Sequence, residues 1–367
     1  MSAYTLSPYF RIDQTKYGGR GAFANTENGH SIPEGTIVLR VPRPLSSSIQ
    51  REFRKEVCQH CFTFQNGKNL KTRLTVPLIS KTISLYFCSS ACLKEFQNYD
   101  DLGLLTSILL EIERHYSSTT REYETTEVKS NLTQVWGQLN KWSETLARMK
   151  PSKRLAETPV ITNDEYSDLK YTATTIFALF KYQKKIGILS PQTSHQYILE
   201  MNELEHMRLE LGIFETLQSN ITEKTQRYPY LSTVYGNIFK FLKIHAPNQL
   251  QPFVTTETVG AIIGRHLSNA FGIWCPDEGI DEFFGFAVYP LASFFNHSCI
   301  PNLKRVRTQR EVYFITTKEI FNPDEELCIN YGNSIEENVQ TRQLLLREWF
   351  FECGCPRCTT EQTEECT

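Results

Sequence analysis

The sequence of 367 residues has no apolar run of the length that crosses a membrane, and it carries almost no net charge. Its densest apolar run, from Ala173 to Phe180, ends at Lys181, whereas a membrane-spanning helix needs about 20 such residues. With 39 Lys and Arg against 41 Asp and Glu, the formal charge of -2 gives no signature of nucleic-acid or anionic-membrane binding. The N-terminal segment has neither a basic leader nor an apolar secretory stretch. We therefore expect a soluble, monomeric protein of the cytoplasm, the nucleus or both.

Cysteine is present in a pattern that suggests metal binding. In a reducing compartment, 11 cysteines are more often buried thiols or metal ligands than disulfides. Cys275, Cys328 and Cys366 stand apart, and the other eight fall into two groups. The first group is Cys58, Cys61, Cys88 and Cys92; the second is Cys299, Cys353, Cys355 and Cys358.

The first group consists of two cysteine pairs with zinc-ligand spacing. Four thiolates match the tetrahedral site of a structural Zn²⁺, which leaves no position open for catalysis. Incidental thiols are the alternative, and a thiol redox protein built on Cys58 and Cys61 is another. His60 could replace a cysteine, although a solvated surface imidazole is the simpler interpretation.

The second group has three thiols within six residues, Cys353, Cys355 and Cys358, and needs a distant fourth. Cys299, in the unusual run from Asn296 to Asn302 (NHSCIPN), is the best candidate. A catalytic zinc with an open position is the competing interpretation. No His or Glu with metalloprotease spacing accompanies these thiols, so the structural site is favoured.

Patterns typical of strands stand at both ends of the chain, and helical patterns lie between them. We expect strands at 35–41, 283–289, 311–317 and 326–331, and helices at 164–185, 198–217 and from a capping box at Ser334 and Glu337 through Trp349. Residues 117–130 and 150–163 are predicted to be loops, and the tail after Cys358 a frayed end. The simplest fold is an α+β protein with one discontinuous β core and two insertions. Three sequential domains are the alternative.

Four motifs occur in a family order: GGRG (18–21), NHSCIPN (296–302), EELCINYG (325–332) and CGCPRC (353–358). Together they resemble a SET-domain protein lysine methyltransferase with a post-SET zinc site. The first cysteine group resembles the MYND finger of the SET/MYND subfamily. It supplies only the first and third of the usual ligand pairs, which implies one zinc in a reduced finger, most like fungal members.

The resemblance implies a discontinuous β-rich SET core at 1–57 and 251–332, with an inserted MYND-like finger at 58–92, a helical insertion at 93–250, a post-SET segment at 333–358 and a tail at 359–367. It also implies S-adenosylmethionine as cofactor, two structural zinc ions and a protein substrate that presents a lysine. The implied cofactor-binding residues are Gly19, Arg20, Gly21, Asn269, Ser293, Asn296, His297, Tyr331 and Phe351. Tyr331 would also be catalytic, and Trp349 would stand in the lysine channel where the family usually has Tyr.

Methyl transfer of this kind requires mainly that the lysine nitrogen, the methyl carbon and the cofactor sulfur are aligned. A narrow apolar channel would lower the pKa of the substrate lysine by desolvation, and Tyr331 would stay protonated. Taken alone, Tyr331 is an ordinary aromatic at a strand end, Asn269 a helix cap and Phe351 a core residue. The alternative function is a weak or inactive SET and zinc-finger interaction module, suggested by Trp349 and the reduced finger.

Overall fold

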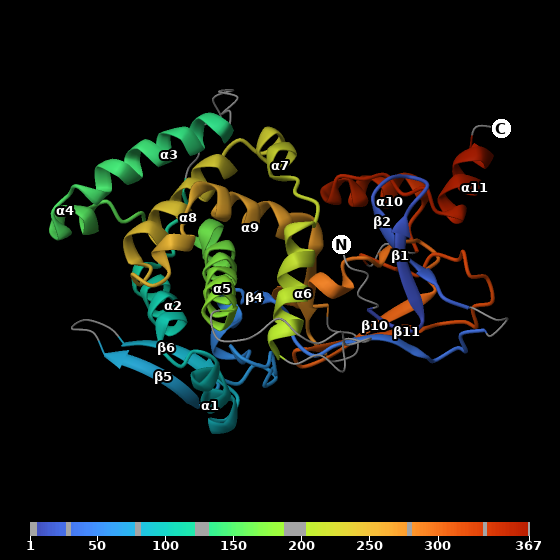
Figure 1. The fold of residues 1–367 in the computed structure, drawn as a ribbon, viewed down its shortest axis with the longest axis horizontal. Coiled ribbons are helices and arrows are strands. Elements are labelled where there is room, and N and C mark those ends of the chain that lie inside the picture. Colours follow the sequence, from blue (N-terminus) through green and yellow to red (C-terminus); the bar gives the residue numbers. More distant parts are fainter. Residues whose placement is uncertain are drawn as a thin grey trace. The chain divides into compact units, whose positions relative to one another are not determined.

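The chain forms two compact units, each assembled from segments that lie far apart in the sequence. The computed structural model describes residues 6–26, 31–77, 82–121, 132–186, 203–276, 281–332 and 336–365. Unit 1 contains residues 1–44, 189–217 and 289–367, and unit 2 contains residues 45–188 and 218–288 (Figure 1). Within the described residues, no helix is both long and apolar enough to span a bilayer.

Unit 1 combines short strands with helices near its C-terminal end. Its elements are β1 (Phe10–Gln14), β2 (Arg20–Ala24), β3 (Ile37–Val41), α6 (Glu203–Glu215), η5 (Pro290–Ala292), β9 (Asn296–His297), β10 (Leu303–Thr308), β11 (Glu311–Thr316), β12 (Cys328–Ile329), α10 (Val339–Leu346), η6 (Arg347–Trp349) and α11 (Pro356–Glu365).

The antiparallel sheet β10-β11-β3 joins the two ends of the sequence. Along β11, every second residue is buried, which is the pattern of a strand with one face on a core. Phe314 pairs with Leu39 and Val312 with Val41, so these apolar side chains meet across the strands. This pairing explains how residues near 40 and near 314 come to share one core.

The parallel pair of β9 and β12 brings Asn296 opposite Cys328 and His297 opposite Ile329. Each strand is two residues long. The Asn302 side chain anchors the β12 segment to the loop after β9. Its Oδ1 accepts from the Cys328 N–H at 2.8 Å, and its Nδ2 donates to the Glu326 carbonyl at 2.9 Å and the Glu325 carboxylate at 2.8 Å.

Unit 2 is mainly helical, with two small sheets, β4-β8-β7 and β5-β6. Its elements are β4 (Ser46–Ile49), η2 (Glu52–Lys55), β5 (Thr72–Pro77), β6 (Thr82–Phe87), α1 (Ser90–Tyr99), α2 (Leu104–His115), α3 (Leu132–Ala147), α4 (Pro151–Ala156), α5 (Asn163–Ile186), α7 (Ile221–Arg227), α8 (Leu231–His245), η4 (Gln251–Phe253), α9 (Thr256–Asn269), β7 (Ala270–Trp274) and β8 (Phe283–Val288).

Helix α5 is the centre of unit 2 and contacts β4, α2, α8 and α9 (Figure 1). Its buried side chains include Tyr166, Leu169, Ile176 and Phe177, the helical pattern that the sequence shows. Phe180 of the same pattern is half-buried. The remaining predicted helix, at 198–217, is found as α6, whose described part begins at Glu203.

Three local predictions from the sequence are wrong. The segment 150–163 contains the short helix α4, which has Pro151 in its first turn, where the missing N–H does no harm. The tail forms α11 through Glu365 instead of fraying at Cys358. Helix α10 begins at Val339, after Asn338, whose side chain accepts the Thr341 N–H. Ser334 of the expected capping box lies outside the described residues.

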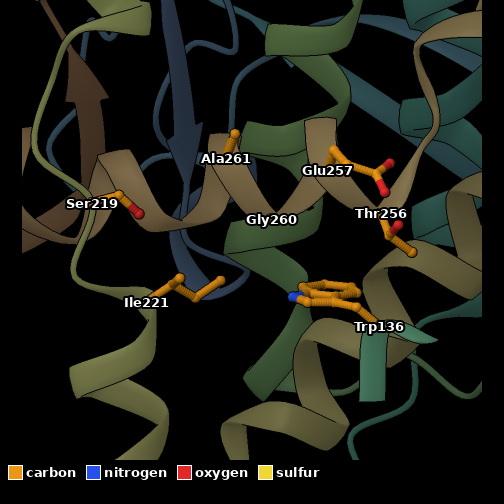
Figure 2. A pocket seen from close by; sticks show the side chains of 7 residues that line it. All are labelled: Trp136, Ser219, Ile221, Thr256, Glu257, Gly260 and Ala261. Atoms are coloured by element: carbon orange, nitrogen blue, oxygen red, sulfur yellow. The ribbon is translucent and has the colours of Figure 1, made fainter. Parts of the chain in front are cut away.

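A pocket of about 230 Å³ opens between three helices of unit 2 (Figure 2). The indole of Trp136 on α3 faces Gly260 on α9, where an added Cβ would lie 3.4 Å from the ring. A side-chain carbon at this position would therefore meet the ring at ordinary van der Waals distance. The lining residues are Trp136, Ser219, Ile221, Thr256, Glu257, Gly260 and Ala261.

Candidate functional site

The glycine-rich turn between β1 and β2 exposes its backbone. Gly18 and Gly19 have φ values of 98° and 77°, a region that favours glycine. Apart from the glycine itself and its two chain neighbours, nothing in the described structure lies within 4 Å of a Cβ built at either residue. Thr15 closes the turn, because its hydroxyl donates to the Gly18 carbonyl and its N–H to the Gly19 carbonyl. The turn is thus held by Thr15 and has open space beside Gly18 and Gly19, which suits close approach of a ligand.

Gly21 has a different role, because it is tightly surrounded. A Cβ at this position would lie 2.4 Å from Glu326 Oε1 and 3.0 Å from Asn296 Nδ2. Asn296 donates from that nitrogen to the Arg20 carbonyl at 3.0 Å and to Glu326 at 2.7 Å. The Tyr17 hydroxyl donates to the same carboxylate oxygen at 2.5 Å. The Glu326 carboxylate therefore fastens the glycine turn to β9.

His297 and Tyr331 are held together by the β9-β12 pairing. The Tyr331 backbone N–H donates to His297 Nδ1 at 3.1 Å, and the two rings lie 5.5 Å apart between centroids. Because Nδ1 is an acceptor, the neutral ring carries its hydrogen on Nε2, which lies 3.4 Å from Cys299 Sγ. Burial lowers the pKa of His297 to about 4, so the neutral form predominates at pH 7.

Tyr331 is held in its protonated form. Its hydroxyl donates to the Phe295 carbonyl at 3.1 Å. Burial raises its pKa well above the usual value, and the nearby Cys328 and Glu326 add to this shift. The hydroxyl can therefore act as a hydrogen-bond donor or as a fixed dipole near neutral pH, and it cannot serve there as an anionic base.

Two further aromatic residues surround Tyr331. The Phe351 ring centroid lies 6.0 Å from that of Tyr331 and 6.0 Å from that of His297. The Trp349 ring lies 6.5 Å from Tyr331. Both side chains are partly buried against the cluster that contains Cys299 and Cys353. The structure therefore brings Asn296, His297, Tyr331, Trp349 and Phe351 into one neighbourhood.

The four sulfurs of Cys299, Cys353, Cys355 and Cys358 lie within 4.8 Å of one another. Cys299 Sγ is 3.5 Å from Cys358 Sγ and 3.9 Å from Cys353 Sγ. A tetrahedral zinc with Zn–S bonds of ≈ 2.3 Å has edges of about 3.8 Å between sulfurs. A hydrogen bond from Cys353 lowers the pKa of Cys355 to about 4, and zinc binds the thiolate form. This quartet fits zinc.

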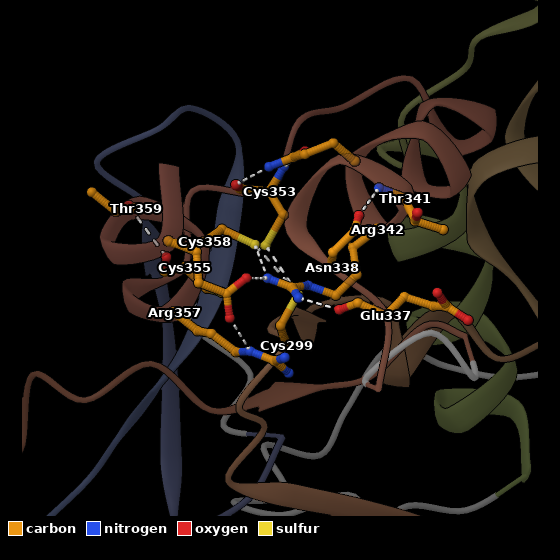
Figure 3. A network of polar contacts seen from close by, with 12 residues as sticks. Cys299, Glu337, Asn338, Thr341, Arg342, Cys353, Cys355, Arg357, Cys358 and Thr359 are labelled. Atoms are coloured by element: carbon orange, nitrogen blue, oxygen red, sulfur yellow. Dashed lines mark hydrogen bonds and ion pairs between the residues drawn. The ribbon is translucent and has the colours of Figure 1, made fainter. Parts of the chain in front are cut away.

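Side chains around this quartet compensate its charge (Figure 3). Arg342 is fully buried and donates to Cys358 Sγ at 3.4 Å and to Glu361 on α11 at 2.7 Å. The amide of Gln343 pairs with both backbone groups of Cys353, at 2.7 and 2.8 Å. These contacts orient the sulfurs and offset negative charge on the thiolates.

The other quartet, in unit 2, has similar geometry. The sulfurs of Cys58, Cys61, Cys88 and Cys92 lie within 4.8 Å of one another. Cys88 Sγ is 3.5 Å from Cys61 Sγ and 3.4 Å from Cys92 Sγ. A hydrogen bond from Cys58 lowers the pKa of Cys61 to about 4. This quartet also fits zinc, and stoichiometric zinc with no accessible thiol at Cys58 and Cys61 would exclude the redox interpretation.

His60 lies beside this second quartet and is paired with a carboxylate. Its Nε2 is 3.2 Å from Glu95 Oε2, and its side chain is 10% exposed. The expectation of a solvated imidazole is therefore wrong. The ring is largely covered because it packs edge-on against Phe96 at 6.4 Å.

Three predicted cofactor residues have local partners. The Arg20 guanidinium donates to the Thr216 carbonyl at 3.0 Å and to its hydroxyl at 2.8 Å, and it lies 5.1 Å from the Phe294 ring centroid. The Ser293 hydroxyl donates to the Tyr289 carbonyl at 3.3 Å. Asn269 belongs to unit 2, where it ends α9 and donates to the carbonyls of Arg265 and Gln218.

Comparison with known proteins identifies the family. The family model of the SET domain matches residues 19–332. The chain belongs to the SET domain family. The matched range runs from the glycine-rich turn to the residue after Tyr331 and therefore includes the two motifs that contain His297 and Tyr331.

Relatives of this SET domain protein include methyltransferases. The potential protein lysine methyltransferase SET6 of Saccharomyces cerevisiae is 30% identical over 98% of this chain and 97% of the relative. A SET and MYND domain-containing protein of Dictyostelium discoideum is 37% identical over 28% of this chain and 24% of its own. The mouse protein-lysine N-trimethyltransferase SMYD5 is 36% identical over 21% of this chain and 20% of its own.

Sequence reasoning missed several residues of this SET domain that position the others. Glu326 and Tyr17 fasten the glycine turn, and Arg342 and Gln343 support the C-terminal quartet. Glu326 lies inside a quoted motif and could have been noticed there. The sequence contains no comparable signal for Arg342, because only the fold brings its guanidinium to a sulfur.

Proposed function

We propose that this protein transfers a methyl group from S-adenosylmethionine to the side-chain nitrogen of a lysine in a protein substrate. The observation that carries the proposal is the meeting of Asn296, His297 and Tyr331 beside the glycine turn through the β9-β12 pair. Membership of the SET domain family and the full-length likeness to a potential lysine methyltransferase support it.

The cofactor, when bound, supplies a methyl group on a sulfonium, which is a good leaving group. The residues present fit such a ligand, because the turn at Gly18 and Gly19 is bare and the ring of Phe351 offers an apolar face. Asn296 uses its Nδ2 to hold the turn, which leaves its Oδ1 available as an acceptor. Gly19, Arg20 and Gly21 would contribute backbone groups, and Ser293 and Asn269 remain predicted contacts.

Tyr331 would orient the reacting groups. Its protonated hydroxyl and the Phe295 carbonyl form a fixed polar pair at 3.1 Å. Such a pair can accept weak C–H···O contacts from a polarised methyl group, and it leaves no strong base beside the sulfonium. Catalysis then depends mainly on alignment, which a preformed pair supplies without further reorganisation.

His297 would position Tyr331. One ring nitrogen accepts the Tyr331 N–H and the other faces Cys299 Sγ. The imidazole thus links the C-terminal quartet directly to the tyrosine. We infer that zinc at this quartet keeps Tyr331 in place, so that removal of the metal should weaken cofactor binding.

We further propose that each cysteine quartet holds one structural zinc. In both, all ligands come from the chain, which leaves no open position for catalysis. The quartet of Cys58, Cys61, Cys88 and Cys92 would form a MYND-like finger with a single zinc. A finger of this reduced kind is not expected to bind proline-rich peptides.

The substrate lysine must lose its proton before it reacts. Desolvation in a channel beside Tyr331 and Trp349 would lower its pKa and favour the neutral amine. The bulk of Trp349 predicts a narrow channel. Trp349→Tyr should therefore change the number of methyl groups that are added or the substrates that are accepted.

A test compares the zinc-loaded wild type with Tyr331→Phe. Calorimetry would measure cofactor binding, and methyl incorporation into proteins of a methylation-deficient extract would measure transfer. We expect both proteins to bind the cofactor and the variant to transfer at least tenfold more slowly. Cofactor binding by the wild type with no transfer to any lysine would support an interaction module instead, and absence of binding would overturn the proposal.

A further inference from the structure

A cluster of two histidines and a glutamate lies in unit 2, among residues outside both cysteine quartets. His115 ends α2, His245 ends α8, and Glu111 lies one turn before His115 on α2. The Glu111 carboxylate and one nitrogen from each ring lie within 4.8 Å of one another. Two imidazoles and one carboxylate are a donor set that binds zinc and similar divalent transition cations.

The distances in this cluster are those between ligands of one ion. Glu111 Oε2 is 3.5 Å from His115 Nε2 and 3.6 Å from His245 Nδ1. Both distances are long for a good hydrogen bond. Zinc bonds of ≈ 2.0–2.2 Å to nitrogen and oxygen place tetrahedral ligand atoms about 3.4 Å apart. By contrast, His266 Nε2 and Asp168 Oδ1, an ordinary histidine and carboxylate pair, lie 3.0 Å apart.

The hydrogen bonds of Thr158 decide which nitrogen of His245 is free to bind. The Thr158 hydroxyl donates its hydrogen to the Leu155 carbonyl at 2.7 Å. It therefore accepts from His245 Nε2 at 2.9 Å, and Nε2 carries the ring hydrogen. The lone pair on Nδ1 then points toward the Glu111 carboxylate. Two acceptors that face each other repel unless a cation lies between them.

The surroundings also favour a cation. The last turns of α2 and α8 meet here, and the C-terminal ends of helices carry partial negative charge. The Phe241 ring packs on His245 at 4.6 Å and limits its movement. The positive charge of Arg114 would repel a cation, but Arg114 pairs with the other oxygen of Glu111, Oε1, at 3.3 Å.

We propose that Glu111, His115 and His245 form a binding site for a zinc-like divalent cation, with Thr158 orienting His245. The side chains of His115 and Glu111 are 32% and 21% exposed, so a fourth position is accessible to water. The ion would join α2, α8 and the segment after α4, to which Thr158 belongs. It would make this part of unit 2 a third metal-dependent element of the chain.

Cobalt is a suitable probe, because it gives visible ligand-field bands and distinguishes nitrogen and oxygen donors from thiolates. Co²⁺ would be titrated into full-length protein whose cysteine quartets are filled with zinc. We expect one further equivalent to bind, with ligand-field absorption and no sulfur charge-transfer band. Zinc added afterwards should displace the cobalt. The protein with zinc at this site should unfold at a higher temperature than the protein in which the site is empty.

Matched variants locate the ion. Glu111→Gln keeps the shape of the side chain and should weaken cobalt binding at least tenfold, as should His115→Gln. Asp168→Asn, which removes a carboxylate from a single histidine, should bind cobalt as the wild type does. Thr158→Val should weaken binding about tenfold while the protein keeps both zinc equivalents. A wild type that binds no further cobalt, or a Glu111→Gln variant with unchanged affinity, would overturn the proposal in favour of a shared proton.

Discussion

The side-chain amide of Asn296 donates to the Glu326 carboxylate at 2.7 Å, and the same nitrogen donates to the Arg20 carbonyl at 3.0 Å. One nitrogen therefore connects the segment before β12 with the glycine-rich turn. Glu326 also accepts from Tyr17. The carboxylate is thus the common acceptor of the two groups that hold the turn, and the shape of the proposed cofactor site depends on it.

Glu326→Gln should weaken binding of S-adenosylmethionine about tenfold, because hydrogen bonds to a charged group contribute about 1.5–3 kcal/mol and an amide accepts them less well. Calorimetry at constant pH would measure the change. Glu319→Gln is the matched control, because Glu319 contacts Ser31 and takes no part in the bonds around the glycine turn. Equal affinities in the two variants would contradict the role of Glu326.

Gly21→Ala should destabilise unit 1 by about 1–3 kcal/mol, since overpacking of a tight site forces its neighbours to shift. The added Cβ would lie 2.4 Å from Glu326 Oε1. Thermal unfolding of the zinc-loaded protein would show the loss. Gly137→Ala on α3, where the new Cβ would meet nothing within 4 Å beyond its adjacent residues and its own helix backbone, should instead stabilise its helix by about 0.5–1 kcal/mol. If both variants changed the unfolding temperature by the same amount and in the same direction, overpacking at Gly21 would not be the cause.

Arg342→Gln should weaken zinc binding at the C-terminal quartet by 10-fold to 100-fold, roughly the range seen when residues behind metal ligands are replaced. The variant loses the donor to Cys358 Sγ and the partner of Glu361. Competition with a coloured chelator would measure zinc release. Arg357 also binds Glu361, at 2.6 Å. Arg357→Gln should therefore retain zinc nearly as the wild type does, and faster release from it than from Arg342→Gln would refute the prediction.

Lys170→Met should make the protein more stable near pH 7. The lysine is buried and donates to Gln59 at 2.9 Å, and burial lowers its pKa from 10.5 to about 8. The unfolded chain keeps this proton up to about pH 10.5, whereas the folded chain begins to lose it near pH 8. Folding is therefore opposed by the charge at pH 7, by about 1–3 kcal/mol, and the free energy of unfolding should rise as the pH increases through this window.

Urea unfolding at several pH values tests this prediction. The advantage of Lys170→Met over the wild type should be largest at pH 7 and shrink between about pH 8 and pH 10.5. Lys153→Met, at an exposed position of α4, should follow the wild type at every pH. A Lys170→Met protein that is less stable than the wild type at pH 7 would show that the hydrogen bond to Gln59 outweighs the cost of burial.

The parts of the fold that the sequence predicts well are those governed by short-range pattern. The alternation in β11 and the apolar face of α5 are visible in the sequence because one face of each element is buried. Both cysteine quartets follow from spacing, except that Cys299 needed the argument that three ligands are one too few. The Cys299 sulfur lies beside those of Cys353 and Cys358, so counting the ligands identified the fourth cysteine correctly.

The parts that the sequence does not predict depend on contacts between distant residues. Helix α11 is polar, and polarity alone suggested a frayed tail. It is held because Cys358 belongs to the quartet and Glu361 pairs with both Arg342 and Arg357. Likewise, no spacing rule connects Glu111 with His245, because they meet only through the packing of α2 against α8. Long-range pairing thus decides both the helical tail and the candidate site at Glu111, His115 and His245.

The amide of Asn302 sets a chemical limit on how long the site stays intact. Strands β9 and β12 are only two residues long, and this side chain anchors the β12 segment to the loop that follows β9. Spontaneous deamidation would turn its donating nitrogen into an anionic oxygen that faces the Glu325 carboxylate and the Glu326 carbonyl. Repulsion there would separate the strands that hold His297 and Tyr331 together, so aged protein should lose activity before it unfolds.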